Sequence, residues 1–217
     1  MGNKAGKALN SKAIKNYQAT THFEPDEIRA LYNQFAQFRT DSSDTKEGPD
    51  ATIDRSEFQL ALGCRDSLFV HRIFELFDEN GDGLINFTEF VTGISILSTK
   101  STIDQKLKFS FKLYDFNNDG KIDNEELRRL LVASLKENGV PMEDAAIDEL
   151  CERTFAAADL NKDGFIDYDE YHQMAIKHPA LMKHLTLNVG EIIAEVTAFR
   201  AAKDAAGGAG GGGAGSA

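Results

Sequence analysis

Three twelve-residue segments of the chain repeat one pattern of oxygen-bearing side chains. They span residues 78–89, 115–126 and 159–170, and each has Asp at position 1, Asn at position 3, Asp at position 5 and Glu at position 12. Carboxylate, amide and carbonyl oxygens are the ligands that calcium prefers, and a twelve-residue loop can supply them from positions 1, 3, 5, 7, 9 and 12. The repeats therefore predict about three bound calcium ions per chain.

We call these segments loops A, B and C, and their candidate ligands follow from the positions. The residue at position 7 would contribute its backbone carbonyl, and the final Glu would bind through both oxygens. The candidates are Asp78, Asn80, Asp82, Leu84, Asn86 and Glu89 in loop A; Asp115, Asn117, Asp119, Lys121, Asp123 and Glu126 in loop B; and Asp159, Asn161, Asp163, Phe165, Asp167 and Glu170 in loop C. Loop A has the fewest acidic ligands and is expected to bind most weakly.

Two other positions of the loops also repeat. Position 6 is always glycine, where the chain must turn sharply: Gly83, Gly120 and Gly164. Position 8 is always isoleucine, which we expect to join paired loops through a short β-bridge: Ile85, Ile122 and Ile166. Acidic turns with glycine also occur as ordinary solvated loops, but three complete matches favour metal binding.

Helical periodicity surrounds each loop, so the repeating unit is helix, loop, helix. Ser101 with Asp104 has the spacing of a capping box and predicts a helix start. Asn138-Gly139 predicts a helix stop, and Pro141 predicts that the next helix begins there. The chain is expected to be all-α.

A fourth, degenerate unit precedes loop A, because units of this kind work in pairs. Residues 40–57 place Ile53 in the position-8 role and Glu57 in the position-12 role, but extra residues interrupt the ligand spacing. We therefore expect no ordinary calcium site there. Instead, Ile53 should pair with Ile85 and support loop A.

Composition excludes several classes of function. The 217-residue chain has a formal net charge of −11, which argues against binding to nucleic acid. Cys64 and Cys151 lack a CxxC spacing and are expected to be free thiols in the cytosol. The sequence contains no phosphate-binding glycine loop and no HExxH motif, so we expect no catalytic residues and no enzyme activity.

The sequence resembles the calcineurin B and plant calcineurin B-like branch of EF-hand calcium sensors. Segments 1–3, 21–28 and 73–78 are similar to calcineurin B, whereas 57–62 and 178–187 are more similar to the calcineurin B-like proteins. The resemblance implies a regulatory subunit that binds calcium and then regulates a Ser/Thr protein kinase. It leaves open the alternative of the regulatory B subunit of the calcineurin phosphatase. A calcium buffer is an alternative of another class.

The expected fold is two lobes of paired EF-hands, with the first hand degenerate, followed by a C-terminal helical extension. The predicted organisation is a basic leader at 1–22, an N-terminal lobe at 23–100 and a C-terminal lobe at 101–178. Amphipathic helices at 179–204 and a disordered Gly/Ala tail at 205–217 complete it.

The resemblance implies that the partner, a kinase or the calcineurin catalytic subunit, lays a helix in a hydrophobic groove. With 15 Phe and 4 Met, the apolar surface should be stiff and aromatic, although most of these Phe side chains should simply fill the core. Residues 180–202 are apolar at helical spacing. They could form either a displaceable lid over the groove or a permanent part of the core.

The N-terminus resembles an N-myristoylation signal at Gly2. Lysines that follow make the leader basic, and one acyl chain with a basic patch is the combination that anchors a protein stably to a membrane. The alternative is a lysine-rich leader without lipid. We expect a cytoplasmic protein with peripheral membrane association.

Overall fold

The computed structural model describes residues 9–38, 51–61, 67–137 and 139–177. The all-α prediction is confirmed, since the strands of the described residues are only two residues long each. The elements in chain order are α1 Ser11–Thr20, α2 Pro25–Phe38, β1 Thr52–Ile53, α3 Arg55–Ala61, α4 Leu68–Phe77, β2 Ile85–Asn86, α5 Phe87–Leu97, α6 Ile103–Tyr114, α7 Asn124–Glu137, α8 Asp144–Ala158 and α9 Tyr168–Lys177.

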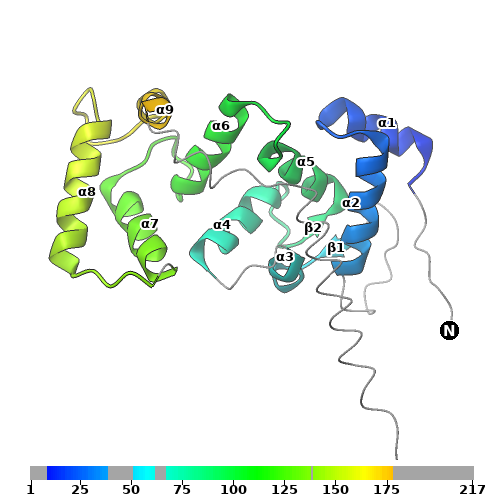
Figure 1. Ribbon diagram of the computed structural model, residues 1–217, viewed down its shortest axis with the longest axis horizontal. Coiled ribbons are helices and arrows are strands. Elements are labelled where there is room, and N and C mark those ends of the chain that lie inside the picture. Colours follow the sequence, from blue (N-terminus) through cyan, green and yellow to red (C-terminus); the bar gives the residue numbers. More distant parts are fainter. Residues whose placement is uncertain (1–8, 39–50, 62–66, 138, 178–217) are drawn as a thin grey trace, which may run out of the picture.

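The helices form an elongated body (Figure 1). Helices α7, α8 and α9 lie at one end, α1 and α2 lie at the other, and α3, α4, α5, α6 and the two strands lie between them. No described helix is both long and apolar enough to cross a bilayer.

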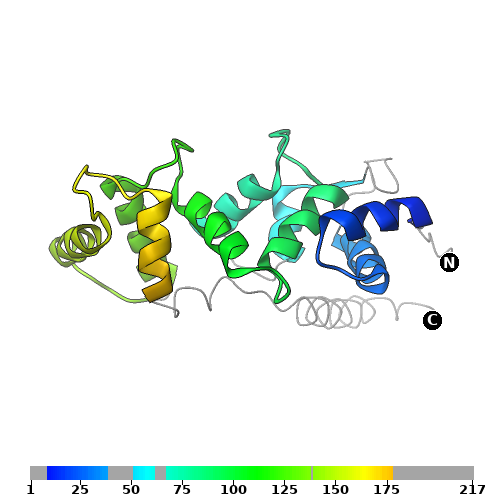
Figure 2. The same ribbon diagram turned by 90° about the horizontal axis from the view of Figure 1, so that it is seen from above.

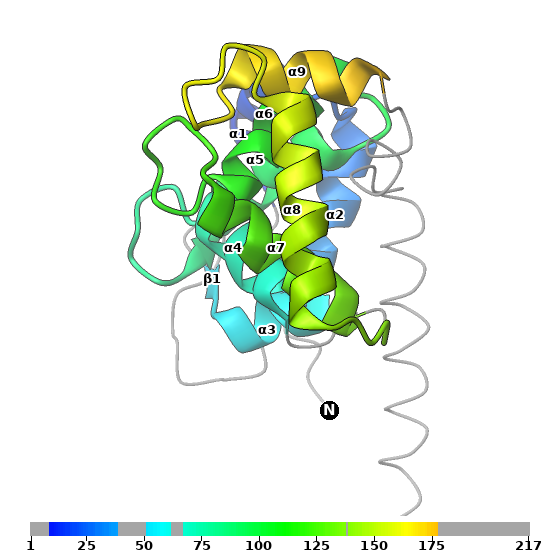
Figure 3. The same ribbon diagram turned by 90° about the vertical axis from the view of Figure 1, so that its left-hand side faces the viewer.

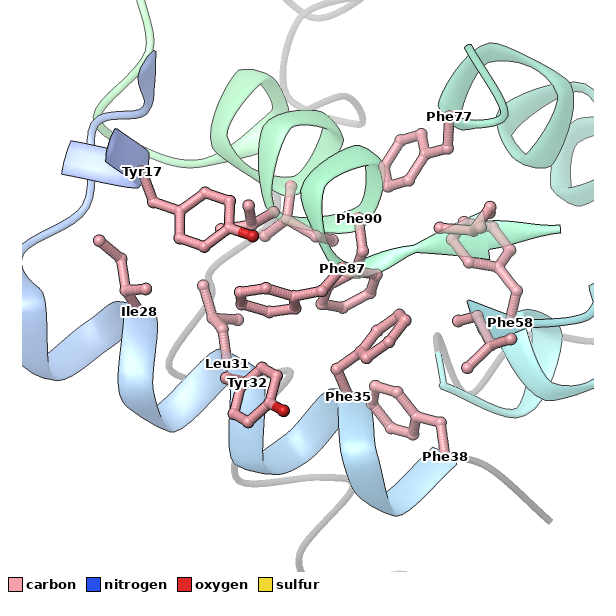
Figure 4. Close-up of a cluster of buried hydrophobic side chains, with 14 of the residues drawn as sticks. Tyr17, Ile28, Leu31, Tyr32, Phe35, Phe38, Phe58, Phe77, Phe87 and Phe90 are labelled. Atoms are coloured by element: carbon pink, nitrogen blue, oxygen red, sulfur yellow. The ribbon is translucent and has the colours of Figure 1, made fainter. Parts of the chain in front are cut away.

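The N-terminal half is built around an aromatic core, which we call the N-terminal cluster: the buried apolar residues from Ile14 to Leu97 other than Val70, together with Phe109. Phe87 lies at its centre, with the rings of Tyr32 and Phe35 edge-on at 5.0 and 5.5 Å between centroids (Figure 4). Edge-to-face packing adds to the hydrophobic contribution of these rings. The prediction that Phe side chains fill the core is confirmed for this group.

The C-terminal half has a smaller core, the C-terminal cluster: Leu107, Phe111, Ile122, Phe155, Ala158, Ile166, Tyr171 and Ala175. One buried polar contact lies next to it, 2.6 Å between the hydroxyl oxygens of Ser110 and Tyr171. Burial raises the pKa of Tyr171 far above its ordinary value, so this hydroxyl stays neutral. A neutral phenol can remain in the core because its hydroxyl has a partner.

Helix α6 contributes to both cores. Phe109 belongs to the N-terminal cluster, where its ring lies 6.2 Å from that of Phe77, whereas Leu107 and Phe111 belong to the C-terminal cluster. A lobe boundary at residue 100 would assign the whole helix to the second lobe. The packing shows instead that opposite faces of α6 belong to different cores.

Helix α1 lies within the stretch expected to be a basic leader. Asn10 caps it by accepting a hydrogen bond from the N–H of Ala13 at 2.8 Å. Ile14 and Tyr17 are buried, and the Tyr17 hydroxyl lies 3.2 Å from that of Thr88. Residues 11–20 are therefore part of the N-terminal core.

Two helix starts differ from the sequence prediction. The capping box that begins α6 is formed by Thr102 and Gln105, one residue later than the predicted Ser101 and Asp104. The Ser101 hydroxyl instead lies against the end of α5, where it donates to the carbonyls of Ile96 and Ser98. Helix α8 begins at Asp144 rather than at Pro141.

The predicted helix stop is confirmed. Helix α7 ends at Glu137, and Gly139 adopts the left-handed conformation with φ of 64°. The N–H of Val140 returns to the carbonyl of Leu135 at 2.9 Å and satisfies one of the last carbonyls of the helix.

Candidate metal centres

Loops A, B and C project from the same face of the molecule (Figures 2 and 3). Loop A joins α4 to the β2–α5 segment, loop B joins α6 to α7, and loop C joins α8 to α9. Each predicted loop therefore lies between two helices, as the sequence pattern indicates.

The backbone of each loop enters the left-handed region twice. The position-6 glycines have φ of 79°, 83° and 85°, as the sequence predicts. Position 4 is also left-handed in every loop: Gly81 at 71°, Asn118 at 57° and Lys162 at 62°. Sequence reasoning missed this second turn, although Gly and Asn at two of the three sites are the residue types that tolerate it.

The Asp at position 1 organises the first half of each loop. Asp78 Oδ1 accepts hydrogen bonds from the N–H groups of Gly81 and Asp82 at 2.9 and 3.1 Å, and its Oδ2 accepts from Gly83 at 2.8 Å. Asp115 and Asp159 accept from positions 5 and 6 of their own loops in the same way. These contacts hold the carboxylate over the interior of the loop.

The Glu at position 12 ties the two ends of each loop together. In loop B, Glu126 Oε1 accepts from the N–H groups of Phe116 and Asn117 at 2.8 and 3.1 Å, and Oε2 accepts from Asp123 at 3.1 Å. The donors in the other loops are Asn80 and Asn86 to Glu89, and Leu160, Asn161 and Asp167 to Glu170. All three Glu side chains are buried, which places a carboxylate at the base of each loop.

The charges of loop A repel one another. Burial raises the pKa of Glu89 above its ordinary value, the N–H groups of Asn86 and Asn80 lower it, and the negative charges of Asp78 and Asp82 raise it again. A divalent cation would relieve this repulsion. The donors of the loops are hard carboxylate, amide and carbonyl oxygens, a set that suits calcium rather than a metal preferring sulfur or nitrogen.

In the part of the chain that the structure describes, no three or more His, Cys, Asp or Glu side chains already gather as a metal-holding group. The acidic side chains of the loops accept hydrogen bonds from their own backbone, as with Asp78 and Glu126. The predicted ligand sets also include side-chain amide oxygens of Asn and main-chain carbonyl oxygens, which a group of His, Cys, Asp and Glu side chains does not include. The residue-by-residue assignment of ligands stays a prediction.

The predicted pairing of loops through position 8 is confirmed. Ile53 pairs with Ile85 in the antiparallel β1–β2 ladder, so the degenerate hand supports loop A as expected. Ile122 and Ile166 exchange two N–H···O bonds of 2.9 Å between loops B and C. All four isoleucine side chains are buried, so the backbone pairing of neighbouring loops is held in place by the hydrophobic core.

The degenerate hand keeps the closing half of a loop. Asp54 and Glu57 exchange hydrogen bonds between side chain and backbone at 2.8 and 3.1 Å, as Asn86 and Glu89 do at the end of loop A. Residues 39–50, which contain most of the predicted insertion, lie outside the described residues. The absence of calcium from this hand stays a prediction.

An apolar cavity of about 770 Å³ lies in the C-terminal half, among α7, α8 and α9. Its apolar lining includes Ile122, Leu130, Leu131, Leu150, Ile166 and Met174. Glu170, the last residue of loop C, also borders it. The sequence predicts a partner groove lined mainly by Phe, whereas the side chains that line this cavity are mostly aliphatic.

Further sequence predictions concern Gly2, the two cysteines and residues 179–204. Gly2, Cys64 and residues 179–204 lie outside the described residues. The other cysteine, Cys151, is a buried free thiol on α8, and burial raises its pKa.

Comparison with known proteins supports this architecture. A family model described as an EF-hand domain pair matches residues 104–176, and one described as an EF hand domain matches residues 69–97. These segments contain loops B and C and loop A, respectively.

Relatives extend the match beyond single hands. The chain is 35% identical over 139 residues to the calcium-binding protein NCSA of Dictyostelium discoideum, covering 63% of this chain and 69% of that protein. It is 32% identical over 130 residues to the type 2 calcineurin B protein of Bos taurus, covering 60% of this chain and 72% of that protein. The chain belongs to the calcineurin B-like family of EF-hand calcium sensors.

The family assignment predicted from the sequence is thereby confirmed, as is calcium as the bound cation. A third relative, the calcineurin B protein of Candida glabrata, is 39% identical over 120 residues, but the match spans only 65% of that protein and 55% of this chain.

Proposed function

We propose that this chain is a calcium-dependent, non-catalytic regulatory subunit of a calcineurin-type Ser/Thr phosphatase. The names of the relatives from Candida glabrata and Bos taurus support the phosphatase alternative over the kinase reading placed first in the sequence analysis. In this proposal, the catalytic activity resides in the partner subunit. This chain contributes calcium binding and a docking surface.

The cavity among α7, α8 and α9 carries the proposal. An amphipathic helix of a partner can insert apolar side chains into such a space, with contacts at i, i+3 and i+4 spacing. Arg153 and Lys177 are exposed and border the cavity, so acidic residues beside the apolar face of the partner helix would be favoured. The occupant is therefore expected to be an amphipathic helix with an acidic flank.

Two residues belong both to a predicted calcium loop and to the wall of the cavity. Ile166 and Glu170 belong to loop C and also line the cavity, so a rearrangement of loop C around an ion changes the wall of the docking site. A calcium buffer has no need for this connection or for an apolar cavity of this size. The geometry favours the sensor over the buffer.

Peptide binding to the purified full-length chain tests the proposal. The probes are a synthetic peptide carrying the helix of a calcineurin catalytic subunit that binds calcineurin B, and a peptide from the regulatory segment of a calcineurin B-like-dependent kinase. Each is titrated with calcium and with a chelator. We expect the phosphatase peptide to bind only with calcium and more tightly than the kinase peptide. The reverse preference would return the function to kinase regulation.

Two variants on one helix localise the contact. Met174 lines the cavity, whereas Ile176 on the same helix is 56% exposed and does not. Met174→Glu should weaken peptide binding at least tenfold, because a charge would be buried against the apolar face of the peptide. Ile176→Glu adds the same charge outside the cavity and should change the affinity less than twofold. Equal effects of the two variants would place the docking site elsewhere.

We further propose a cytoplasmic location with peripheral membrane association through acylated Gly2. Lys12 and Lys15 are exposed on α1, so a basic surface remains when α1 packs on the core. The Gly2→Ala substitution should move the protein from the membrane fraction to the soluble fraction, as measured by fractionation of cells that express it. An unmodified mass after co-expression with an N-myristoyltransferase would contradict acylation.

A further inference from the structure

Arg72 of helix α4 is a buried cation that reaches out of its own hand. Its side chain is only 6% exposed. Nη2 donates to the carbonyl of Lys112 at 2.9 Å, to the carbonyl of Asp115 and to Oδ1 of Asn118 at 2.8 Å. These acceptors are the last turn of α6 and positions 1 and 4 of loop B. We propose that Arg72, which lies in the hand of loop A, is a positioning residue that preorganises the neighbouring loop B for calcium binding.

The first reason is where the acceptors lie. The last carbonyls of a helix have no partner within the helix and form the negative end of its dipole, so a cation there is favourable. Arg72 fills this role for α6 through Lys112 and Asp115. Asp115 is also the first candidate ligand of loop B. Fixing its backbone fixes the point from which its carboxylate enters the loop.

The second reason is the left-handed turn at Asn118, where φ is 57°. The amide oxygen of Asn118 accepts from Arg72 only while the loop keeps this turn, so the contact favours the folded loop. The corresponding residues of loops A and C are Gly81 and Lys162, whose side chains offer no acceptor. The contact therefore belongs to loop B among the three.

The third reason is a cation–π contact with Phe116, position 2 of loop B. The guanidinium carbon of Arg72 lies 5.6 Å from the centre of the Phe116 ring, and that of Arg129 on α7 lies 4.4 Å from the same ring. Cation–π contacts of this kind hold an aromatic side chain in place. The start of loop B is thus held from α4 and from α7 together.

The hydrogen-bonding capacity of Arg72 is not completely used. The buried Nε–H of Arg72 has no acceptor within the described residues. Removing one partner of a buried ionic contact can be strongly destabilising. The partner Glu75 is half-exposed and can return to water in Arg72→Met, and comparing loop B with loop C in that variant separates an effect on the loop from a general loss of stability.

Calorimetric titration of the full-length chain with calcium tests this inference, which rests on loop B being a calcium site. Arg72→Met should raise the calcium Kd of loop B at least tenfold, about 1.4 kcal/mol, and change loop C less than threefold. Glu126→Gln, made separately, removes a candidate ligand and identifies the loop B signal. If Glu126→Gln changes nothing, the ligand assignment fails. If it acts but Arg72→Met does not, only the positioning role fails.

Two further variants separate positioning from a general structural effect. Glu75 is half-exposed and pairs with Nη1 of Arg72 at 3.1 Å, so Glu75→Gln weakens that pair while leaving the loop contacts intact. It should change the loop B Kd less than twofold. Asn118→Gly keeps the left-handed turn but removes the acceptor. It should weaken loop B, and combining it with Arg72→Met should be less than additive.

The calcium-free protein gives an independent readout. The N–H groups of Asp119 and Gly120 donate to Asp115, and the N–H of Gly164 makes the equivalent bond in loop C. Hydrogen exchange without calcium should accelerate at Asp119 and Gly120 in Arg72→Met and stay within twofold at Gly164. Uniform acceleration in both loops would show that Arg72 supports the fold in general and would overturn the inference.

Discussion

Replacing Lys162 with glycine should stabilise the C-terminal half. Lys162 occupies position 4 of loop C with φ of 62°, and its side chain is exposed, so its removal sacrifices no packing. The left-handed conformation costs an ordinary residue about 1–2 kcal/mol. Glycine avoids this strain but loses about 0.5–1 kcal/mol through the greater freedom of the unfolded chain. The net expectation is a gain of about 0.5–1 kcal/mol.

Thermal unfolding of the full-length chain, with calcium and with a chelator, measures this gain. For a chain of this size 1 kcal/mol corresponds to about 2–4 °C, so Lys162→Gly should raise the Tm by about 1–4 °C. Lys162→Ala removes the charge but keeps the strain and is the matched control. Gly81→Ala imposes the same strain in loop A, where an added Cβ meets no atom within 4 Å, and should lower stability. If Lys162→Gly is no more stable than Lys162→Ala, backbone strain is not the relevant quantity.

Three other predictions concern packing, calcium and the C-terminal segment. Gly93→Ala should destabilise the N-terminal half by about 1–3 kcal/mol in urea unfolding, because the new Cβ would lie 2.5 Å from the ring of buried Phe77; an unchanged midpoint would show that the ring moves freely. Calorimetry should find about three calcium ions, with one fewer in Glu126→Gln; four equal sites would contradict the loop assignment. Deleting everything after Pro179 should leave folding intact and tighten peptide binding if residues 180–202 form a displaceable lid, whereas loss of cooperative unfolding would identify them as permanent core.

The features predicted well from the sequence are those encoded by local spacing. Counting positions within a twelve-residue loop placed the turn glycines and the isoleucine pairs, because each depends on register alone. The same counting placed Ile53 opposite Ile85, although the first hand lacks a regular loop.

The features missed depend on contacts between distant segments or on a choice between similar neighbours. Ser101 and Thr102 offer equivalent hydroxyls in the sequence, and the structure places that of Ser101 against the end of α5 and that of Thr102 at the cap of α6. Helical periodicity assigns Phe109 to a face of α6 but not to a particular core. Arg72 resembles any charged helix residue in the sequence, since its acceptors lie about forty residues away.

The shared helix α6 determines how the two halves move in solution. Since its opposite faces are embedded in different cores, the halves cannot swing about a free linker at this point. The elongated body in Figure 1 should therefore tumble in water as a single rod-like particle, with one anisotropic rotational diffusion tensor for α2 and α8 alike. If the proposed partner binds in the cavity at one end, it would thereby also fix the orientation of the N-terminal end, including the exposed lysines of α1.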